Sequence, residues 1–291
     1  MAVRAGAAAG GNLGAGLMVC TSRRGLILGG AAALVAGPGL AQTGGVAGFT
    51  VNRAGIGTAS HGAFDILVGR RARGSRDGVV RVDYSGWKAS VADRAALKSY
   101  IASLTRLSPL TLTRPEQFAF WANLYNAVTI DVVLDAWPVR SIRDIRSGLI
   151  AGPWRRKVVT VAGVELSLDD IEHNIMRKGW SDPRVHYAVN CASYSCPNLP
   201  LRAWRGATLG PGLDAAAREY VNSPRGVTFD GEVLVVSSIY KWYAGDFGSS
   251  DARVIAHLAR YADAPLKTRL EAATRIGRDT YDWSLNAIAR G

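Results

Sequence analysis

The sequence predicts an α+β fold: a single compact domain that is mainly helical and carries a small antiparallel sheet. Three observations lead to this prediction. A long apolar helix is expected over 116–137, two short strand pairs are expected over 157–166 and 226–237, and the last third of the chain is mostly helical in pattern. Glycine and proline are scattered and no repeat is evident, so residues 61–291 are predicted to form one domain.

The first 41 residues resemble an export signal of the twin-arginine type. Arg23 and Arg24 precede an apolar run, rich in glycine and alanine, that ends in small residues near Ala41. The run is short for a membrane span, so a cleaved signal is favoured, and the mature protein is expected to be periplasmic or secreted with no transmembrane span. We expect Met18 to be the true start and residues 42–60 to form a flexible segment.

The net charge of the chain is strongly positive. The 291 residues carry a formal charge of +12, and removal of residues 1–41 takes away three arginines and no acids, which leaves +9. The densest basic clusters, 70–73 and 155–157, are short and lie far apart in the sequence. A nucleic-acid interface would need a clustered basic stripe with interleaved aromatic residues, so a solvated basic surface is favoured and no nucleic-acid partner is expected.

Residues 116–137 predict a buried helix that begins near Pro115 and ends before Pro138. Apolar side chains surround almost the whole of this helix, which is typical of a helix at the centre of a domain. Asn123 and Asn126 must then find hydrogen-bond partners, either on neighbouring backbone or on groups in a site.

A tight hairpin over 157–166 is followed by a clear helix start. Ser167 is a good N-cap, and Asp170 three residues later completes the pattern of a capping box. In the helix that begins here, Glu172 and His173 are adjacent, so a regular helix points them in different directions on surfaces that flank the core. His173 fits a structural role and a site role equally well.

Residues 184–197 hold the densest group of chemically reactive side chains. Apolar and polar residues alternate over 185–189, which predicts a strand with His186 and Asn190 on the same face. Thiol, imidazole and amide are the groups from which nucleophilic sites are built, although the same spacing also permits a disulfide or part of a metal site. This segment is therefore the predicted site.

The two cysteines of this segment are expected to differ. Cys196 lies in a turn-rich stretch before Pro197, so we expect it on a loop with the exposure that a nucleophile needs. Cys191 falls at the end of the predicted strand and is better placed for packing or support. Cys196 is therefore the favoured nucleophile.

The last third of the chain is expected to contribute mostly packing. A helix is predicted over 213–221 and a hairpin over 226–237, turning at Asp230-Gly231. The aromatic segments 240–247 and 281–286 carry single polar residues and are expected to lie in the core with hydrogen-bonded tips.

Several ordered motifs resemble the domain of unknown function 547 family. They are Phe120-Trp-Ala-Asn-Leu-Tyr-Asn-Ala127, Leu168-Asp-Asp-Ile-Glu-His173, His186-Tyr-Ala-Val-Asn-Cys-Ala-Ser193, Ser195-Cys-Pro197, Lys241-Trp-Tyr with Asp246-Phe247, and Tyr281-Asp-Trp-Ser-Leu-Asn286. The resemblance runs from about Arg114 to the C-terminus and implies an α+β domain like those of papain-like or transglutaminase-like thiol enzymes. The motif positions are Asn123, Tyr125, Asn126, Glu172, His173, His186, Asn190, Cys191, Cys196, Lys241, Asp246, Asp282 and Asn286.

A thiol enzyme is the leading hypothesis. In it, Cys196 attacks the carbonyl of an amide or ester in a small-molecule or peptide substrate, and His186 takes its proton and returns it to the leaving group. Glu172 or Asn190 would orient the imidazole, and no cofactor is expected. The residues expected to support this site are Asn123, Tyr125, Asn126, His173, Lys241 and Asp246.

Two other classes of function stay open. One is a binding or scaffold module in the cell envelope, in which Cys191 and Cys196 form a disulfide after export. The other is a metal site formed by both cysteines with His173 and His186, although the spacing of the histidines fits no standard zinc pattern.

Overall fold

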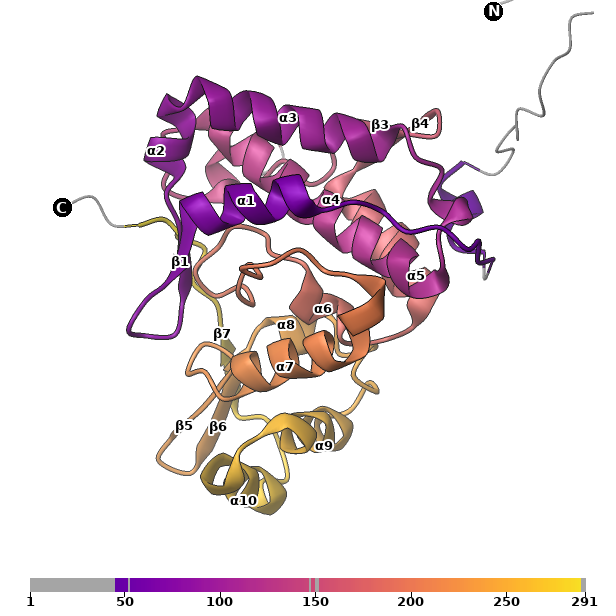
Figure 1. Ribbon diagram of the computed structural model, residues 1–291. Helices are drawn as coiled ribbons and strands as arrows, with labels where there is room; N and C mark the ends of the chain where they lie inside the picture. Colours follow the sequence, from indigo (N-terminus) through magenta and orange to yellow (C-terminus); the bar gives the residue numbers. More distant parts are fainter. Residues whose placement is uncertain (1–44, 52, 147, 150–151, 289–291) are drawn as a thin grey trace, which may run out of the picture. The chain divides into compact units, whose positions relative to one another are not determined.

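The apolar helix predicted from the sequence is the central element of the structure. α4 spans Arg114–Ala136, with Pro115 in its first turn, and all of its residues from 116 to 130 are buried. α2 (Tyr84–Ala89) and α3 (Val91–Thr105) pack directly against α4, and α1 (Gly62–Arg71) packs against α3 (Figure 1). An almost continuously apolar helix excludes water only when other elements cover every side of it, so α4 organises the elements around it.

The computed structural model describes residues 45–51, 53–146, 148–149 and 152–288. The predicted export signal and the start at Met18 lie outside the described residues. The helices are α1 (Gly62–Arg71), α2 (Tyr84–Ala89), α3 (Val91–Thr105), α4, a π-helical segment η4 (Asp170–Met176), α5 (Arg177–Trp180), α6 (Val185–Ala188), α7 (Leu209–Val221), α8 (Ile239–Trp242), α9 (Asp251–Tyr261) and α10 (Ala264–Ala272). Short 3-10 turns cover Gly45–Phe49, Pro109–Thr111, Ile142–Asp144 and Gly206–Thr208.

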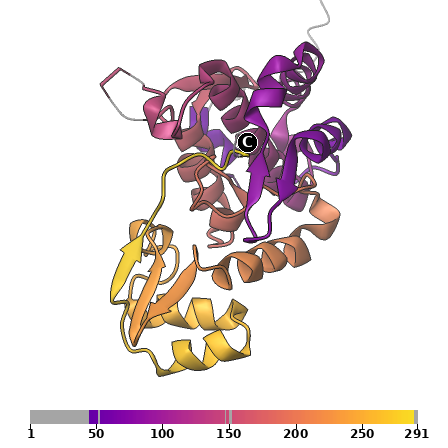
Figure 2. The same ribbon diagram turned by 90° about the vertical axis from the view of Figure 1, so that its left-hand side faces the viewer.

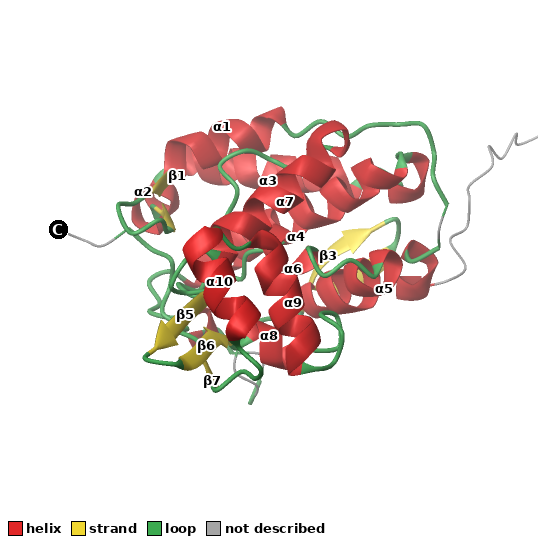
Figure 3. Ribbon diagram, turned by 90° about the horizontal axis from the view of Figure 1, so that it is seen from below, coloured by secondary structure: helices red, strands yellow, loops and turns green. Residues whose placement is uncertain are grey.

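In the described part of the chain the strands form three small sheets, and helices predominate, as predicted for this α+β fold (Figure 3). The strands are β1 (Ala72–Gly74), β2 (Val80–Val82), β3 (Lys157–Val161), β4 (Val164–Ser167), β5 (Val227–Asp230), β6 (Val233–Ser237) and β7 (Arg278–Thr280). The pairs β1–β2, β3–β4 and β5–β6 are antiparallel, whereas β7 adds to β6 in parallel. β7 was not predicted, because its three residues are all exposed and give no apolar alternation.

Both predicted hairpins are confirmed. β3 and β4 are joined by Ala162 and Gly163, whose φ angles of 47° and 81° are the left-handed values of a tight hairpin turn. In the second hairpin Asp230 pairs with Val233, so the turn residues are one position later than predicted from the Asp-Gly pair. The predicted helix over 213–221 is present as the larger part of α7.

Two hydrophobic cores lie side by side within residues 42–291. The first surrounds α4 and includes side chains of α1, α3 and β4, and the second is formed by α7, β5, β6, α9 and α10. Figure 2 shows the orange and yellow elements of the second core gathered below those of the first. α6 joins the two, because Val185 and Ala188 pack in the first core and Tyr187 packs in the second.

The strand predicted over 185–189 is wrong: α6 is a short helix that runs into extended backbone at Val189. Alternation of apolar and polar residues indicates a strand only where one face meets solvent. Here every residue of α6 is buried, including His186, so polarity does not report which way a side chain points.

None of the helices in the described part of the chain is long and apolar enough to cross a bilayer. The segment 42–60, predicted to be flexible, contains Phe49, which is fully buried and packs edge-on against Trp121 at a centroid distance of 5.0 Å.

Candidate functional site

A cavity of about 410 Å³ lies where residues of the two cores meet. α4, η4, α6 with its following loop, α8 and the segment after β7 each contribute to its walls. The lining residues are Tyr125, Gly152, Trp154, Arg155, Asp169, Glu172, His173, His186, Val189, Cys191, Cys196, Ile239, Trp242, Tyr243, Tyr281 and Trp283. Aromatic walls with a few convergent polar groups are the usual composition of a small-molecule site.

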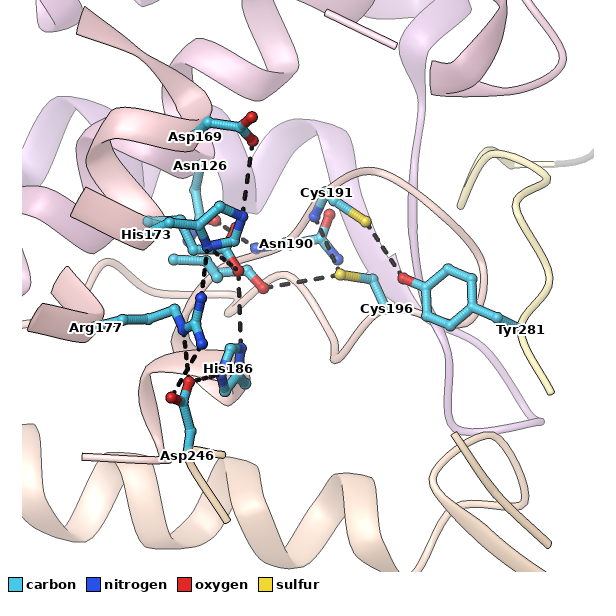
Figure 4. A network of polar contacts seen from close by, with 12 residues as sticks. Asn126, Asp169, His173, Arg177, His186, Asn190, Cys191, Cys196, Asp246 and Tyr281 are labelled. Atoms are coloured by element: carbon cyan, nitrogen blue, oxygen red, sulfur yellow. Dashed lines mark hydrogen bonds and ion pairs between the residues drawn. The ribbon is translucent and has the colours of Figure 1, made fainter. Parts of the chain in front are cut away.

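Two buried asparagines shape the loop that carries the cysteines, which we call the thiol loop (residues 190–197). Asn126 on α4 donates from Nδ2 to the Ala188 carbonyl at 3.0 Å and accepts at Oδ1 from the Asn190 amide at 2.8 Å. Asn190 in turn donates to the Pro197 carbonyl at 2.7 Å and accepts from the Ala192 amide at 2.9 Å. Asn126 thereby fixes the start of the thiol loop to the central helix (Figure 4), and Asn190 ties the end of the loop to its start.

A buried arginine holds the thiol loop from its other side. Arg225 donates from Nη1 to the carbonyls of Tyr194 and Cys196, both at 2.8 Å. Ala192 adopts a left-handed φ of 65°, which turns the chain sharply between the two cysteines. Buried carbonyls need donors, so Arg225 satisfies the loop backbone where no regular structure does.

Both cysteines of the thiol loop are free thiols, and they lie next to each other. Cys191 is half-buried, with Sγ 2.9 Å from Ser193 Oγ and 3.3 Å from Tyr281 Oη. Cys196 is 5% exposed, and its Sγ accepts a hydrogen bond from the Cys191 amide at 3.1 Å. We predicted that Cys196 would be an exposed thiol on a loop. This prediction is wrong, because the hydrogen bonds of the thiol loop fold it inward and bury the Cys196 side chain.

The environments of the two thiols push their pKa values in opposite directions. A hydrogen bond from Cys196, and further bonds from Ser193 and Tyr281, outweigh burial and lower the pKa of Cys191 to about 7. Burial, and then the adjacent Cys191, raise the pKa of Cys196 well above its ordinary value. Cys191 is thus the thiol that ionises near neutral pH.

The opposite end of the cavity is ionic. His186 lies between two carboxylates, with Nε2 2.7 Å from Asp246 Oδ2 and Nδ1 3.7 Å from Glu172 Oε1 (Figure 4). Arg177 also binds Asp246, from Nη2 at 3.0 Å and from Nε. Tyr243 stacks on the imidazole at a centroid distance of 4.4 Å.

The charges at this ionic end stabilise one another. Burial lowers the pKa of His186, but the contacts with Asp246 and Glu172 are stronger and leave it above its ordinary value. Burial likewise raises the pKa of Glu172 and Asp246, but the contacts with His186, together with those of His173 to Glu172 and of Arg177 to Asp246, outweigh it, so both carboxyl pKa values lie below their usual range. An imidazolium held by two carboxylates is the species that these shifts favour.

Glu172 and His173 both line the cavity, contrary to our expectation that a regular helix would separate them on flanking surfaces. They belong to η4, whose wider π-helical turns change the angle between successive side chains. Glu172 is buried, and its Oε1 lies 3.8 Å from His173 Nδ1. The capping box predicted at Ser167 and Asp170 is present just before this segment.

The structure brings together most of the predicted site residues. Those that line the cavity are Tyr125, Glu172, His173, His186, Cys191 and Cys196, and Asp246 joins them through His186. Tyr125 also hydrogen-bonds to Glu172. The remaining predicted residues lie outside the cavity walls.

Three of the predicted site residues do not line the cavity and make structural contacts elsewhere. Asn123 bonds the amide and carbonyl of Trp204, each at 2.9 Å, and so fixes the backbone there. Lys241 is exposed, with Nζ 4.0 Å from Asp251 Oδ1, because α8 turns its neighbours Ile239 and Trp242 to the cavity instead. Asn190 bonds the thiol loop and not the imidazole that we expected it to orient.

Within the described residues no hydrogen bond joins His186 to either cysteine. Its two ring nitrogens face Asp246 and Glu172, so the Cys–His pair predicted from the sequence does not form in this structure. The described residues also contain no group of three histidine, cysteine or acidic side chains arranged to hold a metal ion.

Several lining residues were missed. Tyr243, Tyr281 and Trp283 belong to the aromatic segments that we expected in the core, and a wall of a cavity has the same apolar composition as a core. Arg177 does not line the cavity but binds Asp246 at its ionic end, and its place four residues after His173 was a usable signal for it. Trp154 lies in a short loop before β3 and gave no signal.

Comparison with known proteins gives one match. No curated protein and no solved structure matches the chain, so the implied papain-like or transglutaminase-like relationship stays a prediction. The family model described as "Protein of unknown function, DUF547" matches residues 109–221, which include α4, η4 and the thiol loop. This match supports the resemblance to the DUF547 family that the motifs within residues 120–197 predicted, whereas the motifs over 241–247 and 281–286 lie outside the matched residues.

Proposed function

We propose that this protein is a thiol-dependent acyl-transfer enzyme, a hydrolase or acyl transferase that acts on an amide or ester, with Cys191 as its nucleophile. The observation that carries the proposal is the position of Cys191 Sγ on the wall of an aromatic cavity, in contact with Ser193 and Tyr281. The roles of the two cysteines are thus the reverse of those favoured by sequence alone.

The thiolate needs no separate base. With a pKa of about 7, a substantial fraction of Cys191 is ionised at neutral pH, so a direct contact with an imidazole is not required for attack. The sulfur adds to the carbonyl carbon, a C–S bond forms, and the bond to the leaving oxygen or nitrogen breaks. Water or another acceptor then attacks the resulting thioester and restores the thiol.

The leaving group must take up a proton, and His173 is the group that we assign to this step. It lines the cavity with 28% of its side chain exposed, whereas His186 is 2% exposed and held between two carboxylates. Asp169 and Glu172, whose oxygens lie 3.7 and 3.8 Å from its ring nitrogens, hold the ring in place, and the proton that it gives up is replaced from solvent water.

An acylation assay tests the proposal. The full chain is mixed with p-nitrophenyl acetate, and release of p-nitrophenolate is followed while the acylated peptide is identified by mass spectrometry. We expect a burst of about one equivalent per chain, with the acetyl group on Cys191.

Matched variants make the assay decisive. Cys191→Ser should lose the burst, and Cys196→Ser should keep a measurable one, because the serine hydroxyl can replace the hydrogen bond that Cys196 gives to Cys191. Acetylation at another residue, or a burst that survives Cys191→Ser, would contradict the assignment.

A further inference from the structure

We propose that Cys191 and Cys196 form a reversible disulfide, with Cys191 as the site of attack on a hydroperoxide and Cys196 as the thiol that closes the bond. The proposal concerns the same cavity but does not depend on the acyl-transfer activity, because the oxidation consumes only the two thiols.

The two thiols have the complementary properties that this chemistry needs. Both thiols line the cavity, but Cys191 is half-buried whereas Cys196 is only 5% exposed, so a molecule that enters the cavity reaches Cys191 more readily. The donors around Cys191 favour its thiolate, and burial keeps Cys196 a neutral thiol. A reactive thiolate beside a protected thiol is the arrangement of reversible redox cysteines.

The thiol loop already holds the two side chains together. The Cys191 amide donates to Cys196 Sγ at 3.1 Å, and Cys196 Sγ lies 3.8 Å from the Val189 carbonyl oxygen, so the second sulfur is held against the backbone of the first cysteine. Asn190 and Arg225 fix the backbone on both sides of the turn at Ala192. The second sulfur therefore meets an oxidised Cys191 without unfolding of the loop.

The reaction balances in two steps. The Cys191 thiolate attacks one oxygen of the hydroperoxide, the O–O bond breaks, and Cys191 becomes a sulfenic acid while the other oxygen leaves as an alcohol or water after taking a proton. Cys196 then attacks the Cys191 sulfur, the S–O bond breaks, and hydroxide leaves with the Cys196 proton as water. Two equivalents of an external thiol reduce the disulfide and are themselves oxidised.

This oxidation would protect the nucleophile. A sulfenic acid that finds no partner thiol proceeds to sulfinic acid, which ordinary thiols do not reduce. The predicted export signal is consistent with this role, because exported chains meet oxidising compartments.

Mass spectrometry of the full chain tests the proposal. Both cysteines lie in one tryptic peptide, residues 185–202, so an internal disulfide appears as a loss of two hydrogens from that peptide. The reduced protein is treated with one equivalent of hydrogen peroxide, and free thiols are then alkylated under denaturing conditions. We expect the lighter, unalkylated peptide in the wild type and its full recovery after dithiothreitol.

Single variants separate the two roles. Cys196→Ser should instead gain oxygen on Cys191, trapped by dimedone before further oxidation. Cys191→Ser should lose peroxide reactivity in this peptide by about tenfold or more, because the buried Cys196 has little thiolate.

Three results would overturn the proposal: peroxide adducts on Cys196 in the wild type, a disulfide that joins either residue to Cys20, or peptide 185–202 left reduced under conditions that oxidise free cysteine. None of these readouts uses an acyl substrate. A chain that acylates Cys191 without forming the disulfide would therefore reject only this inference, and the reverse result would reject only the proposed function.

Discussion

The two ends of the cavity are built by different forces. At the thiol end (Cys191, Ser193, Cys196 and Tyr281), neutral thiol and hydroxyl groups converge on one sulfur. At the ionic end (Glu172, His173, Arg177, His186 and Asp246), formal charges pair with one another. Charges that satisfy each other stabilise a structure, whereas donors that converge on one atom change its reactivity. We therefore expect the nucleophilic attack at the thiol end and much of the stability at the ionic end, from which His173 supplies the proposed proton transfer.

The largest effect should come from removing the reactive sulfur. Native full-length protein is labelled with iodoacetamide at neutral pH, and the rate is measured for peptide 185–202. Cys191→Ser should slow labelling of this peptide by roughly a hundredfold, because the remaining Cys196 is buried and protonated. Cys196→Ser is the matched control and should keep rapid labelling, and the opposite pattern would reverse our assignment of the two thiols.

Loss of a charge at the ionic end should lower the stability of the protein. Asp246→Asn leaves His186 and Arg177 without their shared anion, and we expect a loss of about 2 kcal/mol in the free energy of unfolding, measured by urea denaturation. The control is Asp230→Asn, which removes the partner of Arg278 in an exposed pair and should cost about 0.5 kcal/mol or less. Equal effects of the two variants would mean that burial of the ionic end adds no stability.

Reactivity at the thiol end should follow ionisation of Cys191. Only the thiolate reacts, and its fraction grows as pH rises through a pKa of about 7. The native labelling rate should therefore rise about tenfold between about pH 6 and pH 8 and level off above that range. A rate that is still rising steeply above about pH 9 would show an unshifted thiol, whose ordinary pKa is near 8.5.

The smallest effect should come from removing a single hydrogen-bond donor to the Cys191 sulfur. Tyr281→Phe removes the hydroxyl that lies 3.3 Å from Cys191 Sγ, so the pKa of Cys191 should rise and labelling at about pH 6.5 should slow roughly threefold. Tyr243→Phe is the matched control, because its ring stacks on His186 at the ionic end. An unchanged labelling rate in Tyr281→Phe, or an equal change in both variants, would show that Tyr281 does not influence the pKa of Cys191.

Much of the fold could be predicted because local signals and burial agree there. α4 is marked by Pro115 and Pro138 and is apolar on all sides, and the β3–β4 hairpin has both alternation and a turn dipeptide. α6 could not be predicted, since all four of its residues are buried and polarity no longer distinguishes its faces. β7 could not be predicted either, because it forms by pairing with β6, which is distant in sequence, and its own three residues show no strand pattern.

The candidate site was located better than its geometry was. Motif positions placed Glu172, His186 and both cysteines in one cavity, and that is where the structure has them. The exposure of Cys196 was mispredicted because it depends on Asn190 and Arg225, the latter 29 residues away in sequence. The shared direction of Glu172 and His173 depends on a π-helical turn, for which an amino-acid pattern gives no clear sign.

The position of the cavity between the two cores has a thermodynamic consequence. Tyr125 belongs to the first core, and Ile239 and Tyr243 pack with the second, yet all three line one space. A molecule bound there contacts both sets of residues at once and binds only when both are folded. Its binding free energy would therefore act as a linkage between the two cores, raising the melting temperature and making their unfolding a single cooperative transition.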